Sequence, residues 1–199
     1  AAQAQARVAT GARPTLAVVG GRIIDGYGGP VLENGVILVA GERILAVGRE
    51  GEVTIPPGTP VIDANGHTVM PGLIDNHWHT MLVRPTPAQL LAGDYGYMYL
   101  MAGAEATATL MRGFTTVRDL GGPSFGLKQA IDDGTVVGPR IYPSGAIISV
   151  TSGHGDFRQA FELPRAVGAP MSRQELLGAA MIADSPDEVR VRVREQLMK

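Results

Sequence analysis

The sequence predicts an α/β fold in which helices alternate with strands, preceded by a smaller unit of strands alone. Residues 15–63 contain short β-branched runs separated by glycine-rich turns, whereas strand-like and helix-like stretches alternate after Pro71. Strands that are separated by helices favour parallel pairing. We therefore expect a flexible tail over residues 1–14, a β unit over 15–71 and a βα-repeat unit over 72–199.

The composition narrows the possible function classes. Hydrophobic residues make up 45% of the 199 residues, which is enough for a sizeable core, and the formal net charge is −2. This balance offers no basic face for nucleic acid, and no apolar run reaches the roughly 20 residues that cross a bilayer. We therefore expect neither nucleic acid nor a membrane as a partner. Because the chain has no cysteine, a metal would be held by nitrogen and oxygen atoms.

The start of the chain bears on the compartment. Its first residues, AAQAQARVATGARP, are rich in Ala and Gln and look like what is left after cleavage at a small-residue signal-peptidase site. This pattern favours a periplasmic or secreted protein, and a cytoplasmic location stays open.

The β unit contains three strand-like stretches, TLAVVGGRIID, GVILVAGERILAVG and TPVIDA. In the second stretch, AGE predicts a tight hairpin in which Gly41 supplies the left-handed backbone conformation. The stretch DGYGGPVLEN, residues 25–34, is predicted to be a loop.

The second unit is predicted to contain three βα repeats. The strands are expected at GLIDNHWH, GFTTVRDLGG and GPRIYPSGAIIS, and the helices at residues 99–112 and at SFGLKQAIDDG, which Gly134 stops. Residues 151–184 form a long connection with a short helix at residues 173–180.

A final helix is predicted in SPDEVRVRVREQLMK. Ser185 is expected as the N-cap, with Pro186 at the first helical position and Glu188 closing a capping box. The apolar residues of this helix then fall on one face. They are Val189, Val193 and Leu197.

Two histidines stand at the end of the strand in MPGLIDNHWHTMLV, residues 70–83. Because alternate strand residues point the same way, His77 and His79 should project together while Trp78 packs under a helix. Asp75, two positions earlier, is expected on the histidine face. The carboxyl ends of strands carry the chemistry in βα barrels, so the pair is a candidate cation site. The alternative is two histidines that form hydrogen bonds in a polar pocket.

The motif VMPGLIDNHWHT, preceded by GGRIIDG and ERILAVG and followed by GFTTVRDLGG, resembles the amidohydrolase superfamily of metal-dependent hydrolases. Within it, the chain is similar to the imidazolonepropionase-like branch, which includes Xaa-Pro and Xaa-Arg dipeptidases and ochratoxin-cleaving amidases. The resemblance implies a TIM-type (β/α)8 barrel, of which the first three βα units are present, beside a small β-sandwich. It also implies that His77 and His79 bind one or two divalent metal ions, with Zn as the expected metal.

The resemblance implies further metal-site residues: a carboxylated lysine, two more histidines and an aspartate that acts as general base. We expect them beyond Lys199, in the missing C-terminal half of a polypeptide about twice this length, because a full barrel takes about 250 residues. Lys199 itself is expected at the end of a helix, where a cation complements the helix dipole. The alternative is that Lys199 is the bridging lysine.

Three residues are candidates for substrate binding. His154 lies in TSGHGDF after the third strand, and the resemblance implies that this segment faces the substrate; the alternative is a solvated loop histidine. Asp156 either orients His154 or caps the turn. Arg118, beside Asp119 at the end of the second strand, either contacts substrate or forms an internal ion pair.

The resemblance implies an enzyme that cleaves the amide bond of a dipeptide or N-acyl amino acid with a metal-activated water. One alternative is a cyclic amidohydrolase or deaminase of the imidazolonepropionase type. Another, from a different class, is a non-catalytic fragment or binding module. The expected partners are a small-molecule or dipeptide-like substrate, the rest of the same polypeptide, and further copies in a homo-oligomer.

Overall fold

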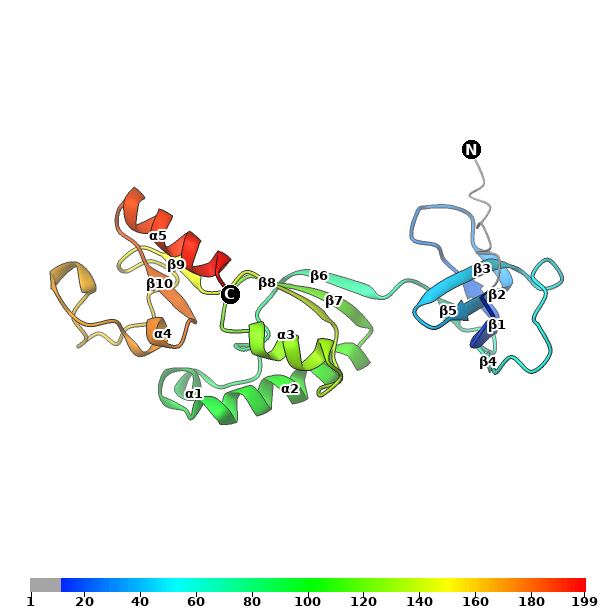
Figure 1. Cartoon of the computed structure of the whole chain (residues 1–199), viewed down its shortest axis with the longest axis horizontal. Helices are drawn as coiled ribbons and strands as arrows, with labels where there is room; N and C mark the ends of the chain where they lie inside the picture. Colours follow the sequence, from blue (N-terminus) through cyan, green and yellow to red (C-terminus); the bar gives the residue numbers. More distant parts are fainter. Residues whose placement is uncertain (1–11) are drawn as a thin grey trace. The chain divides into compact units, whose positions relative to one another are not determined.

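The computed structural model describes residues 12–199, so most of the predicted tail over residues 1–14 lies outside the described residues. The chain divides after Pro71 into two compact units, each described by itself below (Figure 1). Among the described residues, no helix combines the length and the apolar character that crossing a membrane requires.

The first unit is one mixed β-sheet. Its strands are β1 (Leu16–Ile23), β2 (Leu32–Ala40), β3 (Arg43–Arg49), β4 (Val61–Asp63) and β5 (Thr68–Val69). The order is β3-β2-β1-β4, with β5 also beside β1; β1 is antiparallel to β2 and parallel to β4 and β5. All described strands of this unit belong to this one sheet, so the sandwich stays a prediction.

Local turn chemistry decides the hairpin of this sheet. Gly41 has φ +55° between β2 and β3, which confirms the predicted left-handed glycine. The prediction of a loop over residues 25–34 is wrong at its end, because β2 already begins at Leu32. Pairing with Ile23 across the sheet extends this strand into a stretch whose composition is that of a loop.

The second unit contains a parallel sheet with helices on one face. The sheet has the order β6-β7-β8, from β6 (Leu73–Trp78), β7 (Phe114–Asp119) and β8 (Arg140–Pro143). Between the strands lie α1 (Pro87–Ala92), α2 (Tyr95–Met111) and α3 (Phe125–Asp132). The predicted parallel pairing is confirmed.

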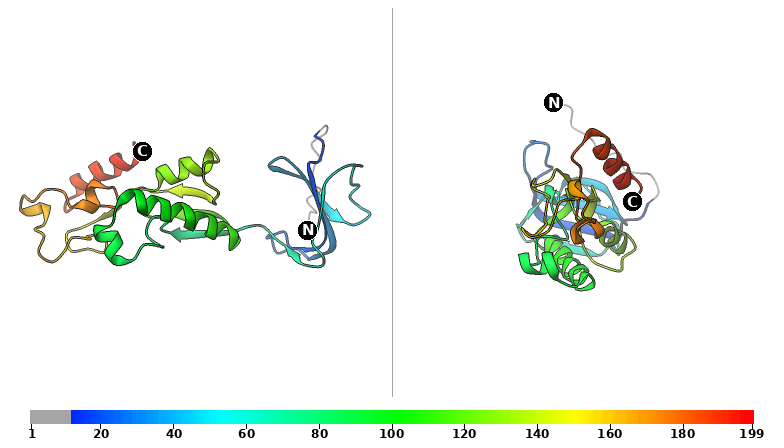
Figure 2. Two further views of the ribbon diagram at one scale, coloured as in Figure 1. Left: turned by 90° about the horizontal axis from the view of Figure 1, so that it is seen from below. Right: turned by 90° about the vertical axis from the view of Figure 1, so that its left-hand side faces the viewer.

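The core of this unit lies between the sheet and its helices. Figure 1 shows α2 and α3 on the same side of the sheet, and in Figure 2 α2 again lies over it. Val117 of β7 and Ile141 of β8 are buried against Leu127 of α3 and the alanines of α2. The two long helices were predicted; α2 begins four residues earlier than expected because Asp94 caps it, accepting a hydrogen bond from the Tyr97 amide at 2.9 Å.

The predicted third strand is divided in two. After β8 the chain bends at Gly145 (φ +82°), and β9 (Ile147–Ser149) pairs in parallel with β10 (Ala180–Ile182) in a separate two-stranded sheet. The segment predicted as a long connection therefore contains a strand, together with η1 (Arg165–Val167) and α4 (Arg173–Leu176). Three residues of β10 are too few to show a strand period in the sequence.

Helix α5 (Pro186–Leu197) begins where predicted, and the side chains that it buries are polar. Ser185 accepts a hydrogen bond from the Glu188 amide, while the Glu188 carboxylate accepts from the Asp184 amide instead of closing the predicted capping box. The buried side chains are Arg192 and Gln196, whereas the predicted apolar face is exposed.

The buried polar side chains of α5 form hydrogen bonds with backbone groups of neighbouring segments. Gln196 Oε1 accepts a hydrogen bond from the Ala146 amide at 2.8 Å, and Arg192 Nε donates to the Ile182 carbonyl at 3.4 Å. A buried backbone group without a partner costs free energy, so polar side chains are favoured at these positions.

Candidate functional site

The two candidate metal ligands lie side by side at the carboxyl end of β6. The imidazole rings of His77 and His79 have centroids 5.3 Å apart and planes at 76°. Trp78, between them in sequence, packs against the buried cluster under the helices. His77 is exposed and His79 is half-buried. The alternation of strand residues predicted this arrangement.

A bulge at the end of β6 changes the face of the preceding aspartate. Asp75 and Trp78, three residues apart, pair with Val117 and Asp119, which are two residues apart on β7, so β6 carries one extra residue. Asp75 therefore lies in register with buried Val117, and the prediction that it shares the histidine face is wrong. Its Oδ1 accepts a hydrogen bond from the His77 amide at 2.9 Å, which holds the backbone of the bulge.

One nitrogen of His79 is already engaged. Its Nδ1 lies 3.3 Å from the carbonyl oxygen of Gly121, in the loop after β7. Because a carbonyl oxygen can only accept, this contact is a hydrogen bond when Nδ1 carries the hydrogen, and in that neutral tautomer the lone pair is on Nε2. A ring fixed in this way at one nitrogen can offer the other to a metal ion.

Arg118 and Asp119 do not form the internal ion pair that the sequence suggested as one alternative. Asp119 is fully buried, and its carboxylate accepts hydrogen bonds from Thr80 and Gly121. Arg118 is exposed, on the face of the sheet opposite to Val117, and forms no ion pair with any residue between 12 and 199. Its role in substrate binding stays a prediction.

His154 and Asp156 lie in the loop after β9. His154 is exposed. Asp156 accepts hydrogen bonds from the Ser152 amide at 2.7 Å and from Arg158 Nε at 2.8 Å, so its carboxylate caps the turn. The Arg158 guanidinium holds the pKa of Asp156 below its ordinary value. Turn capping was one of the two predicted roles; substrate contact by either residue stays a prediction.

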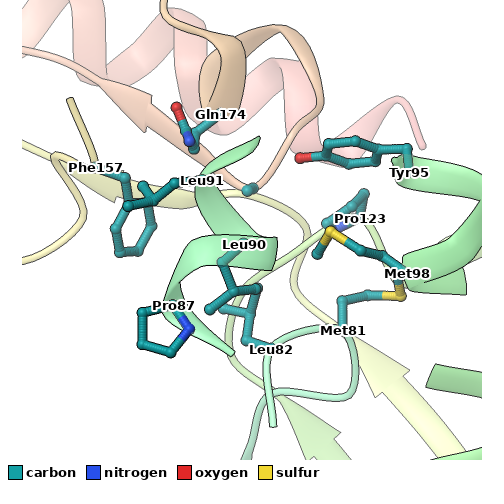
Figure 3. Close-up of a pocket in the computed structure, with 11 residues that line it drawn as sticks. Met81, Leu82, Pro87, Leu90, Leu91, Tyr95, Met98, Pro123, Phe157 and Gln174 are labelled. Atoms are coloured by element: carbon teal, nitrogen blue, oxygen red, sulfur yellow. The ribbon is translucent and has the colours of Figure 1, made fainter. Parts of the chain in front are cut away.

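The structure contains an apolar pocket of about 270 Å³, which the sequence analysis did not predict. Its first lining residues, Met81 and Leu82, follow His79 closely in the sequence. It begins in the turn after His79, where Leu82 donates its amide hydrogen to the His79 carbonyl at 2.9 Å. Figure 3 shows Phe157 and Tyr95 on opposite sides of it. Burial raises the pKa of the Tyr95 hydroxyl. The lining comes from α1, α2, α4 and several loops, and no local pattern joins these segments.

The donor atoms near β6 fit part of a metal centre. Two neighbouring imidazoles are a ligand type that suits Zn and other transition metals. Within residues 12–199, no cluster of three or more His, Asp or Glu side chains could hold a metal ion, and the role of His77 and His79 as metal ligands stays a prediction. Lys199 follows the C-terminal end of α5, as predicted, with Nζ beside Gly178.

Comparison with known proteins extends this picture. The Aspergillus niger ochratoxinase is 33% identical over 203 residues, which cover 92% of this chain and 39% of that protein. The N-acyl-D-aspartate deacylase of Alcaligenes xylosoxydans xylosoxydans is 38% identical over 100 residues, 50% of this chain and 16% of that protein.

The chain is also similar to proteins of known structure. A prolidase in complex with N-methylphosphonate-L-proline superimposes with a TM-score of 0.80 at 34% identity, over 92% of this chain and 44% of the prolidase chain. The chain therefore spans less than half the length of ochratoxinase and of the prolidase. The model of the amidohydrolase family matches residues 68–199, which include His77, His79 and the whole second unit. This chain belongs to the amidohydrolase family.

Proposed function

We propose that the polypeptide containing this chain is a metal-dependent amidohydrolase that cleaves the amide bond of a dipeptide or N-acyl amino acid. The observation that carries the proposal is the pair of imidazoles, 5.3 Å apart, at the carboxyl end of a parallel strand. The relatives support it, because an ochratoxinase, a prolidase and an N-acyl-D-aspartate deacylase share this part of the chain.

His77 and His79 would hold one divalent ion, which we propose to be Zn. Such an ion polarises a scissile carbonyl and lowers the pKa of a water molecule. The residues fit this role: His79 offers Nε2 because Nδ1 faces the Gly121 carbonyl, and His77 is accessible. Catalytic zinc sites take three protein ligands, so we propose that the remaining ligands and the general base come from elsewhere in the native polypeptide.

We propose that the sheet β6-β7-β8 continues into a (β/α)8 barrel. Its face away from the helices carries exposed apolar side chains, with Ile74 62% and Tyr142 57% exposed. In a barrel this face would be filled by side chains from the other strands. The lengths of ochratoxinase and the prolidase, more than twice the matched part, support this proposal.

The substrate would lie between the metal and the loops that follow the strands. Arg118 is exposed on the open face of the sheet and could pair with the free carboxylate of an amino acid product. His154, exposed in its glycine-flanked loop, would donate to the scissile carbonyl or the carboxylate. The apolar pocket after His79 would take an apolar side chain or acyl group.

The test measures metal content and hydrolysis with the native polypeptide. We expect bound divalent metal and release of the amino acid from N-acyl amino acids or Xaa-Pro dipeptides, with activity lost to a chelator and restored by Zn. A panel that includes an imidazolone and an aminopurine separates the alternative of a cyclic amidohydrolase or deaminase. A metal-free polypeptide that cleaves none of these compounds after Zn addition would refute the proposal.

A further inference from the structure

Asp119 is a fully buried carboxylate that the chemistry described above does not use. It is the last residue of β7, with 0% of its surface exposed. Its Oδ2 accepts hydrogen bonds from the Thr80 amide at 2.9 Å and from the Thr80 hydroxyl, and its Oδ1 accepts from the Gly121 amide at 2.9 Å. No arginine or lysine within residues 12–199 forms an ion pair with it, so its hydrogen bonds there come from two backbone amides and one hydroxyl.

The two segments that Asp119 joins meet at His79. Thr80 directly follows His79, and the carbonyl of Gly121 is the group that faces His79 Nδ1 at 3.3 Å. A further backbone hydrogen bond, from the Leu120 amide to the Trp78 carbonyl at 2.9 Å, runs between the same segments. The Asp119 carboxylate therefore fixes the backbone on both sides of this imidazole.

The loop around Gly121 packs closely against the side chains of Ile147 and His79. A Cβ at Gly121 would lie 3.6 Å from His79 Cε1 and 2.2 Å from Ile147 Cγ1. The peptide thus passes directly beside the imidazole, and a small rotation of it would move the carbonyl away from Nδ1. The Gly121 amide belongs to the preceding peptide, and the Asp119 carboxylate that accepts from it restrains the loop on that side of Gly121.

We propose that Asp119 is a positioning residue that holds His79 as the tautomer with hydrogen on Nδ1 and so presents the Nε2 lone pair to a divalent cation. This inference rests on the proposed function, in which His79 is a metal ligand. Asp119 does not touch the metal or the substrate; it acts through Gly121 and Thr80.

The test compares the wild type with Asp119→Asn and with the matched pair Thr80→Val and Thr80→Ser. Asparagine keeps the shape but has only one acceptor oxygen, so one of the two segments loses its partner. Valine removes the hydroxyl donor, and serine keeps it. The two readouts are the ¹⁵N NMR signature of the His79 tautomer in metal-free protein and the Zn affinity, measured by competition with a chelator.

We expect Asp119→Asn to shift the tautomer of His79 and to weaken Zn binding by about 10- to 100-fold. Thr80→Val should weaken binding by a smaller factor, and Thr80→Ser should restore it. Leu127→Ala, in the buried cluster under the helices, is the control for loss of stability: it should lower the unfolding temperature and leave both readouts unchanged.

The outcomes separate this inference from the proposed function. If the wild type binds Zn and Asp119→Asn binds it equally well with an unchanged His79 tautomer, the inference is overturned. If the wild type binds no Zn, the proposed function fails, and the tautomer of the metal-free protein still decides whether Asp119 orients His79. If Asp119→Asn does not fold, the difference between Thr80→Val and Thr80→Ser decides, and identical behaviour of the two overturns the inference.

Discussion

Replacing Gly121 with alanine should destabilise the second unit through one steric contact. An ideal Cβ at this position would lie 2.2 Å from Cγ1 and 2.8 Å from Cδ1 of Ile147, at the start of β9. Carbon atoms pack at about 3.5–4.0 Å, so either the loop or β9 has to move. The contact is with the first branch of the isoleucine side chain, which cannot swing away without leaving its rotamer.

The expected decrease in the free energy of unfolding follows from this geometry. Overpacking typically costs about 1–3 kcal/mol, and we expect the upper half of that range because backbone movement is required. For a chain of this size, 2 kcal/mol corresponds to a decrease in unfolding temperature of roughly 4–8 °C. Ile147→Ala removes the opposing atoms, so the double variant should recover part of the loss, with a coupling free energy of about 1–2 kcal/mol.

The assay is denaturant and thermal unfolding of the wild type, both single variants and the double variant. Gly103→Ala is the matched control, because a Cβ on Gly103 would lie at an ordinary 3.8 Å from Val136. Gly103 lies inside α2, where alanine should raise the free energy of unfolding by roughly 0.5–1 kcal/mol. The reasoning is refuted if Gly121→Ala is as stable as the wild type. It is also refuted if the free energies of the Gly121 and Ile147 variants simply add.

Three further predictions follow from the site. His77→Ala and His79→Ala should each lower Zn affinity by more than about 100-fold in a chelator competition, beyond the usual effect of outer-shell changes, while His67→Ala in the first unit should have no effect. Leu90→Trp, which fills part of the apolar pocket, should raise KM roughly tenfold for an N-acyl phenylalanine but leave KM for an N-acyl glycine unchanged in steady-state assays. The pKa of Asp156 is lowered by its arginine partner, so its stabilisation is present above the ordinary carboxyl pKa of about 3.9 and is lost as pH falls below it. The unfolding temperatures of the wild type and Asp156→Asn should therefore converge as the pH falls below about 4, and a constant difference would contradict this.

Features that depend on a few neighbouring residues could be predicted from the sequence. The hairpin at Gly41 follows from the one residue that tolerates φ +55°. The start of α5 follows from Ser185, whose hydroxyl accepts from the Glu188 amide. The side-by-side rings of His77 and His79 follow from strand alternation, which acts over two residues.

Features that depend on contacts between distant segments could not be predicted. β10 exists because it pairs with β9, more than 30 residues earlier, and its three residues carry no period of their own. α5 buries Gln196 instead of its valines because the Ala146 amide, 50 residues away, needs an acceptor. The apolar pocket has the same origin, since its lining comes from several separate segments.

The histidine site shows both kinds of information. The sequence by itself determined that two imidazoles stand on one side of a strand end, because the spacing of side chains along a strand is a local property of the backbone. Only the tertiary structure decided which nitrogen of His79 faces a protein acceptor, since that depends on the Gly121 carbonyl, 42 residues away. A hydrogen bond between two strands' loops exists only after the strands have paired, and no pattern within either segment encodes it.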